Sequence, residues 1–364
     1  MKVKIPFLNN QDLFGLDIGA MNVKLVKLKN IGDEFIVTNV DIEPVVDDIS
    51  KEIVPLEKQN LVVSAVKRLC SRNKLGTKRV VTSISGSSVI VRFVKFPAMT
   101  KEELIDSIRF EAEPYIPFDI NEVELAFEIT GQCAEEGQQK MDTVLVAAKK
   151  NIIDENVEIL QMSGLRPVMI NIDAFALEKV SGLSDTLRNE TIMYVNIGAV
   201  NTTMLILENG ISKVVRDIAI GGKEFTNALS HTSGKTNLES ERDKLAQSIL
   251  PEQPEINEEA QVSDKRTVLL GVAKDILDEI QRSINYFQAQ TGEINVSKIF
   301  LTGGSASLKG LDAYFSSELD IPVSVFNPFD YVSIKEGIDT KKLEEIGPMF
   351  AVAVGLAMQL EKVK

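Results

Sequence analysis

Apolar and polar residues alternate in three short runs near the start of the chain, which cover Leu13–Ile18, Val23–Lys29 and Glu34–Ile42. The turn-forming segments DIGAMN and NIGD separate these runs. The pattern predicts an antiparallel meander of three strands. Over Leu56–Cys70 the apolar residues recur at helical spacing instead. The N-terminal part of the chain is therefore predicted to fold as a βββα unit.

The segment 78–150 has the pattern of a small sheet inserted into this unit. Strands are predicted near Val80–Ile84, Val89–Phe96, Glu122–Thr130 and Thr143–Ala148. We expect the segment to form a subdomain of its own.

A helix is predicted inside the insert from about Lys101 to Glu113. Thr100 precedes it and Glu103 follows three residues later, which is the spacing of a capping box. Pro114 then ends the helix, because proline lacks a backbone N–H group.

The strand pattern restarts in the second half of the chain. The apolar runs Ile192–Asn196, Thr202–Leu207 and Ile211–Ile220 predict a second meander, and Gly221-Gly222 lies before a predicted helix. The two βββα units indicate an ancient duplication.

The remaining segments differ sharply in polarity. Residues 232–265 are polar and acidic, which is typical of a mobile insert or a small cap. Val268–Phe287 has the apolar spacing of a long amphipathic helix, and Lys298–Thr302 is a predicted strand that leads into Gly303-Gly304-Ser305. Met349–Met358 is apolar and rich in small residues, so we expect a buried helix.

Composition excludes several classes of function. With 364 residues, of which 44% are apolar, the chain is long enough for two or more domains. A formal net charge of −13 argues against binding to nucleic acid or directly to anionic lipid, because both require a basic surface. Cys70 and Cys133 have no CxxC spacing, which argues against a thiolate zinc site and favours a reducing compartment. No run approaches the ~20 apolar residues of a membrane-spanning helix, so a cytoplasmic location is expected.

The loop DIGAMN after the first strand recurs as NIGAVN after the first strand of the second half. Each loop contains a glycine that lets backbone N–H groups approach a phosphate closely. Two such loops can hold a phosphate chain from both sides, as in a nucleotide cleft. A single Asp-x-Gly turn is common, but the two loops, Gly221-Gly222 and a strand ending in LTGGSA occur here in order.

This order of motifs resembles the actin-like ATPase superfamily, which includes actin, sugar kinases, heat-shock chaperones and the cell-division protein FtsA. The two loops match its two phosphate motifs, and the strand ending in LTGG matches its adenosine motif. Within the superfamily, Phe96-Pro97, EELIDSIRFEAEPYIPFDINEVELAFEI and the terminal GPMFAVAVGLAMQ are similar to the PilM family of type IV pilus assembly. The resemblance covers nearly the whole chain. It implies an α/β fold of two duplicated lobes around a nucleotide cleft, with a small FtsA-type α+β insertion in the first lobe.

The resemblance also divides the chain into segments. The first lobe would comprise residues 12–77, 151–190 and the C-terminal helix at 346–364, with the partner-binding insert at 78–150. The second lobe would comprise 191–222 and 296–345, with a cap at 223–295 that holds the acidic insert and the long helix.

ATP and Mg²⁺ are the cofactors that the resemblance implies. The first phosphate loop would contribute Asp17, Gly19, Ala20, Met21, Asn22 and Lys24, and the second Asn196, Gly198, Ala199, Val200 and Asn201. Gly221, Gly222 and Lys223 would lie near the sugar and phosphates, and Gly303, Gly304 and Ser305 near adenine. Glu279, Arg282 and Ser283 share one side of the long helix and match ribose- and adenine-contacting positions. A surface ion pair is the alternative interpretation of Glu279 and Arg282.

Two departures from the superfamily pattern concern catalysis. Asn196 stands where the second phosphate motif commonly has Asp, so the metal and the attacking water lose a charged partner. Ala20 and Met21 stand where a Ser or Thr hydroxyl is common. Asp17 would be the main carboxylate left to hold Mg²⁺ through water. We therefore expect ATP to bind and its hydrolysis to be slow or absent.

The partner implied by the resemblance is the N-terminal cytoplasmic peptide of a PilN-like inner-membrane protein, held in a groove between the insert and the first lobe. Membrane association would then be indirect, and the wider partners would be the pilus assembly platform and its motor ATPases, with homo-oligomerisation left open. The apolar residues of the insert are candidates for the groove, although they also suit the insert's own core: Phe93, Phe96, Tyr115, Ile116 and Phe118.

Other functions remain as alternatives. An FtsA-like filament protein of cell division is disfavoured because no amphipathic membrane-targeting tail follows the last core helix before Lys364. A cytoplasmic platform component of a type II secretion system is a related alternative. A sugar or acetate kinase would need a catalytic carboxylate near the second phosphate loop, and Asn196 argues against it.

Overall fold

A six-stranded sheet forms the first lobe of the protein in the computed structural model, which describes residues 13–32, 34–48, 51, 53–135, 137–246, 260–292 and 294–359. Across the sheet, its strands are β14 (Ser333–Ile334), β3 (Glu34–Pro44), β2 (Asn22–Ile31), β1 (Phe14–Ile18), β4 (Arg79–Ile84) and β8 (Arg166–Ile172). The predicted meander is confirmed, because β1, β2 and β3 pair antiparallel. Strands β4 and β8 extend the sheet parallel to β1.

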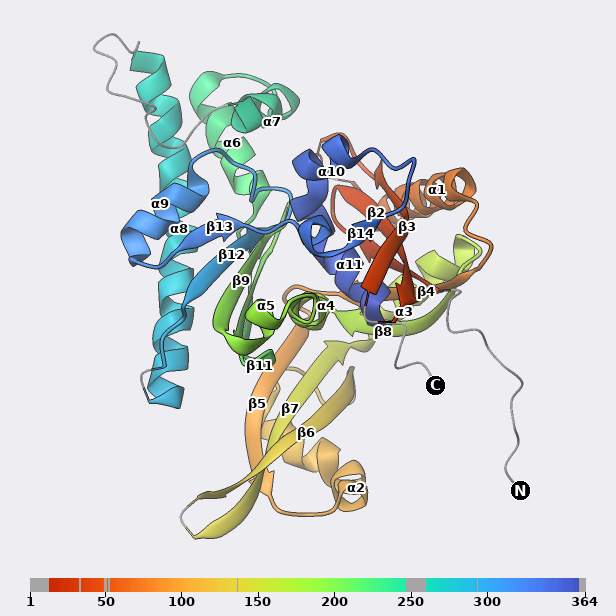
Figure 1. The fold of residues 1–364 in the computed structure, drawn as a ribbon, viewed down its shortest axis with the longest axis vertical. Helices are drawn as coiled ribbons and strands as arrows, with labels where there is room; N and C mark the ends of the chain where they lie inside the picture. Colours follow the sequence, from red (N-terminus) through yellow and green to blue (C-terminus); the bar gives the residue numbers. More distant parts are fainter. Residues whose placement is uncertain are drawn as a thin grey trace.

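The second lobe repeats this arrangement (Figure 1). Across its sheet, the strands are β11 (Ile211–Ile218), β10 (Thr202–Glu208), β9 (Thr191–Ile197), β12 (Lys298–Thr302) and β13 (Val323–Val325). Strands β9 to β11 form the second meander, and β12 and β13 run parallel to β9. The predicted repeat of the βββα unit in two lobes is therefore confirmed. Strand β14 comes from the second half of the sequence yet pairs with β3 of the first lobe. This pairing joins the two lobes.

One strand lies in a different sheet from the one expected. We assigned Val80–Ile84 to the sheet of the insert, and this is wrong: β4 pairs with β1 and β8 in the first lobe, with Leu16 opposite Thr82 and Ser83 opposite Asn171. Nearly every residue of β4 is buried, as is usual for a central parallel strand covered on both faces. The sheet of the insert therefore begins after Ile84.

The insert is a three-stranded sheet that projects from the first lobe (Figure 1). Its strands are β5 (Val89–Pro97), β7 (Gln138–Lys149) and β6 (Val123–Glu135), in that order across the sheet. Helix α2 (Lys101–Ala112) and the 3₁₀ turn η1 (Glu113–Tyr115) pack on one face. The capping box is confirmed, since Thr100 and Glu103 satisfy each other's backbone N–H groups.

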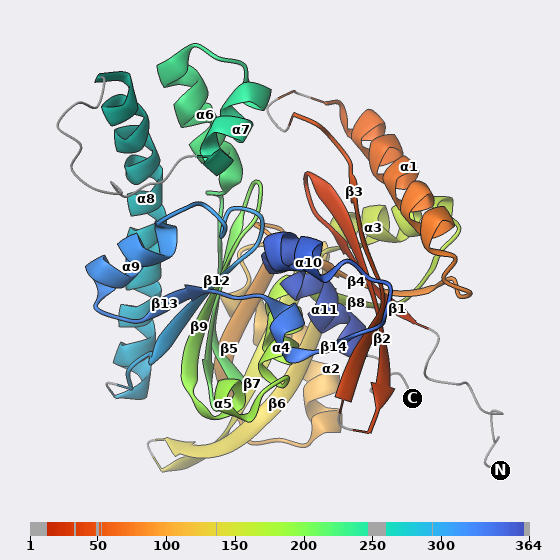
Figure 2. The ribbon, with the colours of Figure 1, turned by 45° about the horizontal axis from the view of Figure 1, so that its top comes forward.

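Helices cover the faces of both large sheets (Figures 1 and 2). The first lobe has α1 (Pro55–Asn73), α3 (Lys150–Met162), α4 (Asp173–Ser181) and α5 (Asp185–Asn189). The second half adds α6 (Gly222–Ser233), α7 (Asn237–Ala246), α8 (Ala260–Thr291) and α9 (Leu311–Leu319). The chain then continues through η2 (Pro328–Tyr331), α10 (Thr340–Ile346), η3 (Gly347–Phe350) and α11 (Ala351–Met358). Helix α8 confirms the predicted long amphipathic helix.

Part of the segment expected to be mobile is helical. Residues 237–246 of the polar segment 232–265 form α7, which packs against α6 (Figure 2). Two polar side chains of α7, Ser240 and Lys244, are buried there. Lys244 makes polar contacts there with Gly222 and Thr226 of α6 and with Glu241. Residues 247–259 lie outside the described residues.

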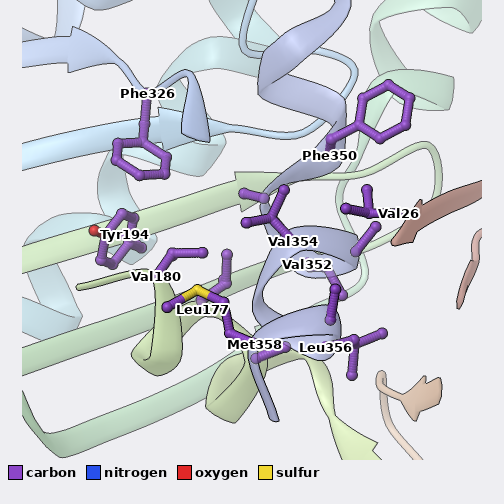
Figure 3. Packing of buried hydrophobic residues seen from close by; sticks show 14 of the residues in the cluster. Val26, Leu177, Val180, Tyr194, Phe326, Phe350, Val352, Val354, Leu356 and Met358 are labelled. Carbon is purple, nitrogen blue, oxygen red and sulfur yellow. The ribbon is translucent and has the colours of Figure 1, made fainter. Parts of the chain in front are cut away.

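Helix α11 fills the space between the lobes, and all of its residues are buried. It belongs to a cluster that contains Val26 of the first sheet and Tyr194 of the second (Figure 3). Glycines allow close packing on two sides: a Cβ at Gly15 of β1 would overlap α11, and a Cβ at Gly355 of α11 would overlap α4. The predicted buried helix is confirmed.

Candidate functional sites

The carboxyl ends of the parallel strands meet at one edge of each large sheet. In the first lobe, β1, β4 and β8 end at Ile18, Ile84 and Ile172, and in the second, β9 and β12 end at Ile197 and Thr302. Loops beyond such ends form the ligand sites of α/β proteins. Loops from both lobes line a common cavity of 410 Å³, which we call the cleft.

The two predicted phosphate loops have the same backbone geometry. The Gly19 N–H donates to the carbonyl of Asn22 at 3.0 Å, and the Gly198 N–H donates to the carbonyl of Asn201 at 2.9 Å. Both loops are therefore tight hairpins closed by an equivalent hydrogen bond. They enter the cleft from opposite lobes.

The structure brings most of the predicted nucleotide-binding residues together. Those that line the cleft are Asp17, Gly19, Ala20, Met21, Asn22, Lys24, Asn196, Gly198, Ala199, Val200, Asn201, Gly222, Lys223, Gly303, Gly304 and Ser305. Gly221 lies directly behind this wall, where a Cβ would overlap the backbone of Gly198 and Val200.

Glycine is required at two points of the cleft wall. Gly303 has a φ of +88°, and a Cβ there would lie 2.6 Å from the side-chain oxygen of Asn196. A Cβ at Gly222 would overlap the hydroxyl of Ser305. Any side chain at these two positions would therefore displace neighbouring atoms of the cleft wall.

Asp17 and Lys24 form an ion pair inside the cleft. They face each other across the β1–β2 pair, and Lys24 Nζ lies 2.8 Å from Asp17 Oδ2. Both side chains are largely buried, at 11% and 13% exposure. A cation and a carboxylate therefore stand next to the first phosphate loop, while the neutral Asn196 occupies the corresponding position in the second lobe.

Asp173 adds a second carboxylate to the cleft. It is the first residue of α4 and accepts a hydrogen bond from the Ser83 hydroxyl at 2.5 Å. Burial, and next the negative charge of Asp17, raise the pKa of Asp173 to about 6. This carboxylate can change its protonation state near neutral pH.

Helix α7 contributes a buried cation to the opposite wall. Lys244 Nζ donates to Glu241 at 2.7 Å and to the carbonyl of Gly222 at 3.3 Å. Burial lowers the pKa of Lys244, and Glu241 opposes this effect. The glycine-rich start of α6 is therefore fixed by a charged side chain that also lines the cleft.

Three predicted residues lie outside the cleft lining. Glu279 accepts a hydrogen bond at 2.9 Å from Arg216 of β11, and it also pairs with Arg282. Ser283 is fully buried and accepts a hydrogen bond from Arg216 at 3.2 Å. The structure does not bring this face of α8 to the cleft, because it packs against β11. The ion pair considered as the alternative for Glu279 and Arg282 is present.

The residues of the cleft fit a magnesium nucleotide. Glycine backbone from both lobes can surround phosphates, and Asp17 and Asp173 can hold a hydrated cation. Within the described residues, no group of three or more His, Cys, Asp or Glu side chains forms a metal cage. Mg²⁺ needs no such cage when phosphates and water supply most of its ligands.

Comparison with known proteins identifies the family. A family model described as type IV pilus assembly protein PilM matches residues 15–361. The chain belongs to the PilM family. A solved PilM–PilN type IV pilus biogenesis complex is similar with a TM-score of 0.81 and 26% identity, over 96% of this chain and 98% of that chain. The resemblance inferred from the sequence is thus confirmed.

More distant relatives of this PilM-family chain share the actin-like fold. Cell division protein FtsA of Bacillus subtilis (strain 168) is 20% identical over an alignment of 383 positions, which covers 96% of this chain and 83% of FtsA. The crystal structure of MreB5 of Spiroplasma citri bound to ADP has a TM-score of 0.52 and 13% identity, over 94% of each chain. Among the described residues, no helix is long and apolar enough to span a bilayer.

A second cavity of this PilM-family chain lies where the insert meets both lobes, and we call it the groove. Its volume is 500 Å³. From the insert it is lined by Ala126, Phe127, Glu128, Ile129, Thr130, Val144 and Val146. From the lobes it is lined by Asn171, Phe175, Glu178, Lys179, Ile211, Ser212 and Gln359. None of the aromatic residues proposed for it from the sequence is among these.

Most of those proposed residues belong to the insert's own core. Phe96 and Ile116 are buried against α2, and Phe118 packs around the same cluster. Phe93 packs on the opposite face of the sheet, and Tyr115 is 41% exposed. Phe96, Ile116 and Phe118 therefore stabilise α2 on its sheet, while Phe93 packs on the other face, in one cluster with groove residues such as Val146 and Phe175.

Sequence reasoning missed several residues of the cleft: Ser85, Asp173, Thr203, Glu241, Lys244, Leu245, Ser307, Glu345, Ile346 and Met349. A signal existed for Asp173, since an acidic residue directly follows the apolar strand VMINI and starts a helix. For Glu241 and Lys244 the only signal was their helical spacing of three residues.

Proposed function

We propose that this PilM-family protein binds ATP and Mg²⁺ in the cleft and binds the N-terminal cytoplasmic peptide of a PilN-like membrane protein in the groove. It would thereby act as a nucleotide-dependent scaffold of the type IV pilus assembly platform, recruited to the inner face of the membrane through its partner. The observation that carries the proposal is the pair of equivalent glycine hairpins that enter one cavity from opposite lobes.

The nucleotide would bridge the two lobes. Its phosphates would lie between the hairpins, close to Lys24, and the Mg²⁺ would be held through water by Asp17. Binding energy gained from both lobes favours their closed arrangement. Because Asn196 supplies no charge, we propose that hydrolysis is slow or absent and that the nucleotide acts mainly as a structural ligand.

The groove suits an extended peptide. Residues 126–130 of β6 all line it, although alternate side chains of a strand point to opposite faces, so the groove reaches the backbone edge of this strand. Strand β6 is the last in its sheet, and an edge strand offers unpaired N–H and C=O groups. Val144 and Val146 provide an apolar floor. The similar solved structure is a PilM–PilN complex, which supports a PilN-like partner.

Calorimetric titration tests the nucleotide half of the proposal. Wild-type protein with Mg²⁺ should take up one ATP per chain, and Gly303→Val should abolish the uptake because its side chain would intrude on the cleft wall. Phosphate release should stay near background. The proposal of slow hydrolysis is wrong if the wild type releases phosphate rapidly with Mg²⁺ and Asp17→Ala abolishes that release.

Fluorescence anisotropy with a labelled synthetic peptide tests the peptide half. The peptide is the N-terminal segment of the PilN-like protein encoded by the same organism. Ala126→Arg places a long charged side chain in the groove and should weaken binding at least about tenfold. The matched control is Ala134→Arg on the same strand, which lies outside the groove lining and should bind like the wild type. Equal binding by both variants would place the peptide elsewhere.

A further inference from the structure

A third cavity, which we call the Tyr331 pocket, lies apart from the cleft and the groove and shares no lining residue with either. Its volume is 330 Å³. Three segments that are distant in sequence line it: Glu34 and Phe35 of β3, Gly182 and Leu183 after α4, and Tyr331 of η2. The proposed function makes no use of this pocket.

The ring of Tyr331 is fixed from behind by buried aromatic residues. It stacks on Phe326, with the ring centroids 5.5 Å apart and an angle of 21° between the planes. Phe326 is only 1% exposed, and it meets the ring of Tyr194 edge to face at 5.2 Å between centroids (Figure 3). Phe326 therefore covers one face of the Tyr331 ring. Because Tyr331 is 38% exposed, a ligand can reach the ring from its other side.

Two carboxylates lie near this ring. Glu34 accepts a hydrogen bond from the hydroxyl of Ser333, which follows Tyr331 by two residues in the strand that pairs with β3. Asp330 directly precedes Tyr331, and burial, followed by the negative charge of Asp330, raises the pKa of the Tyr331 hydroxyl. None of the described residues that line the pocket is Lys or Arg. The pocket is therefore acidic and lacks a cation of its own.

The remaining walls are apolar, since Phe35 and Leu183 pack against the core cluster that contains Phe326. An arginine side chain matches this combination of surfaces. Its methylene stem can pack on apolar residues, and its planar guanidinium can stack on an aromatic ring and pair with a carboxylate at the same time. A lysine ammonium matches less well, because it is a compact and strongly hydrated point charge.

We propose that the Tyr331 pocket binds an arginine side chain of a partner protein, stacked on Tyr331 and paired with Glu34. Charge complementarity carries the proposal, since an acidic, aromatic pocket on a chain of net charge −13 favours a cationic partner. Glu34 and Tyr331 are both exposed, whereas sites for free small molecules bury most of the ligand surface. An arginine presented by a partner protein therefore fits better than a free small cation.

The pocket would anchor one point of a larger contact, because buried arginine and tyrosine residues often dominate the binding energy of protein interfaces. The inference requires neither a nucleotide in the cleft nor a peptide in the groove. It can therefore fail while the proposed function stands.

Saturation-transfer difference NMR with the full chain tests the proposal, because this method detects weak, millimolar binding. The probe is an acetylated and amidated pentapeptide with one central arginine between alanines, and saturation should be strongest at the arginine side-chain protons. The same peptide with citrulline keeps the shape and loses the charge, so it should bind about tenfold more weakly. Ethylguanidine, a free small cation, should also bind more weakly than the arginine peptide.

Variants locate the binding. Glu34→Gln keeps an acceptor for Ser333 but removes the charge, and it should weaken binding of the arginine peptide about fivefold. Tyr331→Leu removes the ring and should weaken binding about threefold or more, whereas Tyr331→Phe keeps the ring and should bind like the wild type. The matched control is Glu336→Gln, which removes an exposed carboxylate outside the pocket lining and should have no effect.

The combination of these results decides the question. Saturable binding of the arginine peptide that falls in Glu34→Gln and Tyr331→Leu, and is kept in Tyr331→Phe and Glu336→Gln, supports the inference. Glu34→Gln alone supplies the test if Tyr331→Leu does not fold. Equal binding of the arginine and citrulline peptides, or full binding by Glu34→Gln, would show that the inference is wrong. Binding of ethylguanidine as tight as that of the peptide would identify a small cation as the ligand and overturn the proposed protein partner.

Discussion

Gly355 of α11 packs directly on the carbonyl group of Ala176 in α4, so closely that any Cβ at position 355 would overlap that carbonyl. This contact joins the helix between the lobes to the helix that extends from the cleft to the groove. The two backbones touch without an intervening side chain, and the position of α4 therefore depends on that of α11.

Gly355→Ala should destabilise the protein by about 2 kcal/mol or more, because the added methyl group has no free volume and must displace backbone. Thermal unfolding followed by circular dichroism measures the effect. Gly271→Ala is the matched control: Gly271 lies within α8, and a Cβ added there would meet no atom within 4 Å, so alanine should be neutral or slightly stabilising. Equal melting temperatures for Gly355→Ala and the wild type would contradict the packing described here.

Lys24→Met should weaken ATP binding by about 10- to 100-fold. The substitution removes a cation from the phosphate side of the cleft and leaves the Asp17 carboxylate without its partner, at a cost typical of a hydrogen bond to a charged group. Lys29→Met removes the same charge from an exposed position on the same strand and should bind ATP normally. Calorimetry with Mg²⁺ gives both dissociation constants. An unchanged affinity in Lys24→Met would show that the phosphates lie elsewhere.

Asp173→Asn should stabilise the protein at alkaline pH and have little effect in acid. The pKa of Asp173 is raised to about 6 in the folded protein from an ordinary value of 3.8, so ionisation of this group disfavours folding. The loss of folding free energy caused by this ionisation is absent near pH 4 and grows as the pH rises toward 6. Above pH 6 it reaches its full value, with an upper bound of about 3 kcal/mol.

The measurement for this variant is the difference in melting temperature from the wild type between pH 4 and pH 8. It should rise by a few degrees across this range, about 2–4 °C for each kcal/mol. The exposed Asp185→Asn serves as the control and should show a flat difference. If Asp173→Asn raised the melting temperature more at pH 4 than at pH 8, ionisation of Asp173 would favour folding, which would contradict the prediction.

Lys244→Met should weaken nucleotide binding by about tenfold or more, while Arg282→Met should leave it unchanged. Lys244 lines the cleft and holds the carbonyl of Gly222, whereas Arg282 is exposed on α8 and pairs with Glu279 outside the cleft lining. Calorimetric titration of the two variants with ATP decides between α7 and α8 as the helix that contacts the nucleotide. A loss of affinity in Arg282→Met alone would restore the sequence-based prediction.

Asn196→Asp should increase Mg²⁺-dependent phosphate release if the missing carboxylate limits hydrolysis. The change adds a negative charge beside the second phosphate loop, where it can hold a metal-bound water. A coupled phosphate assay compares the variant with the wild type, each with and without Mg²⁺. If the variant binds ATP yet hydrolyses it no faster than the wild type, Asn196 is not the reason for slow turnover.

Local motifs were predicted from the sequence more successfully than the contacts between distant segments. The two hairpins could be found because glycine and the flanking strands specify each of them locally, and their repetition gave the duplicated fold. Strand β4 was assigned to the wrong sheet because an apolar run does not indicate which neighbours it pairs with. Asp173 was missed because its role depends on Ser83 and Asp17, which are distant in sequence.

Helix α7 is a second example of an element whose contacts could not be predicted from the sequence. Its composition is that of a solvated or disordered segment, and the tertiary contacts of Lys244 and Glu241 with α6, which the sequence does not reveal, hold it in place. Glu279, Arg282 and Ser283 of α8 were assigned to the nucleotide site from the family resemblance alone, because the sequence does not show which residues they contact. Which of two adjacent helices reaches the cleft is decided by packing.

The position of α11 in the sequence has a consequence for biosynthesis. Strands β1 and β2 are translated long before α11, the helix that covers their apolar side. Until α11 has been synthesised, the nascent chain exposes an apolar surface that it cannot yet cover. Chaperone binding in that interval would protect this surface from aggregation, and the fold closes only once α11 is available.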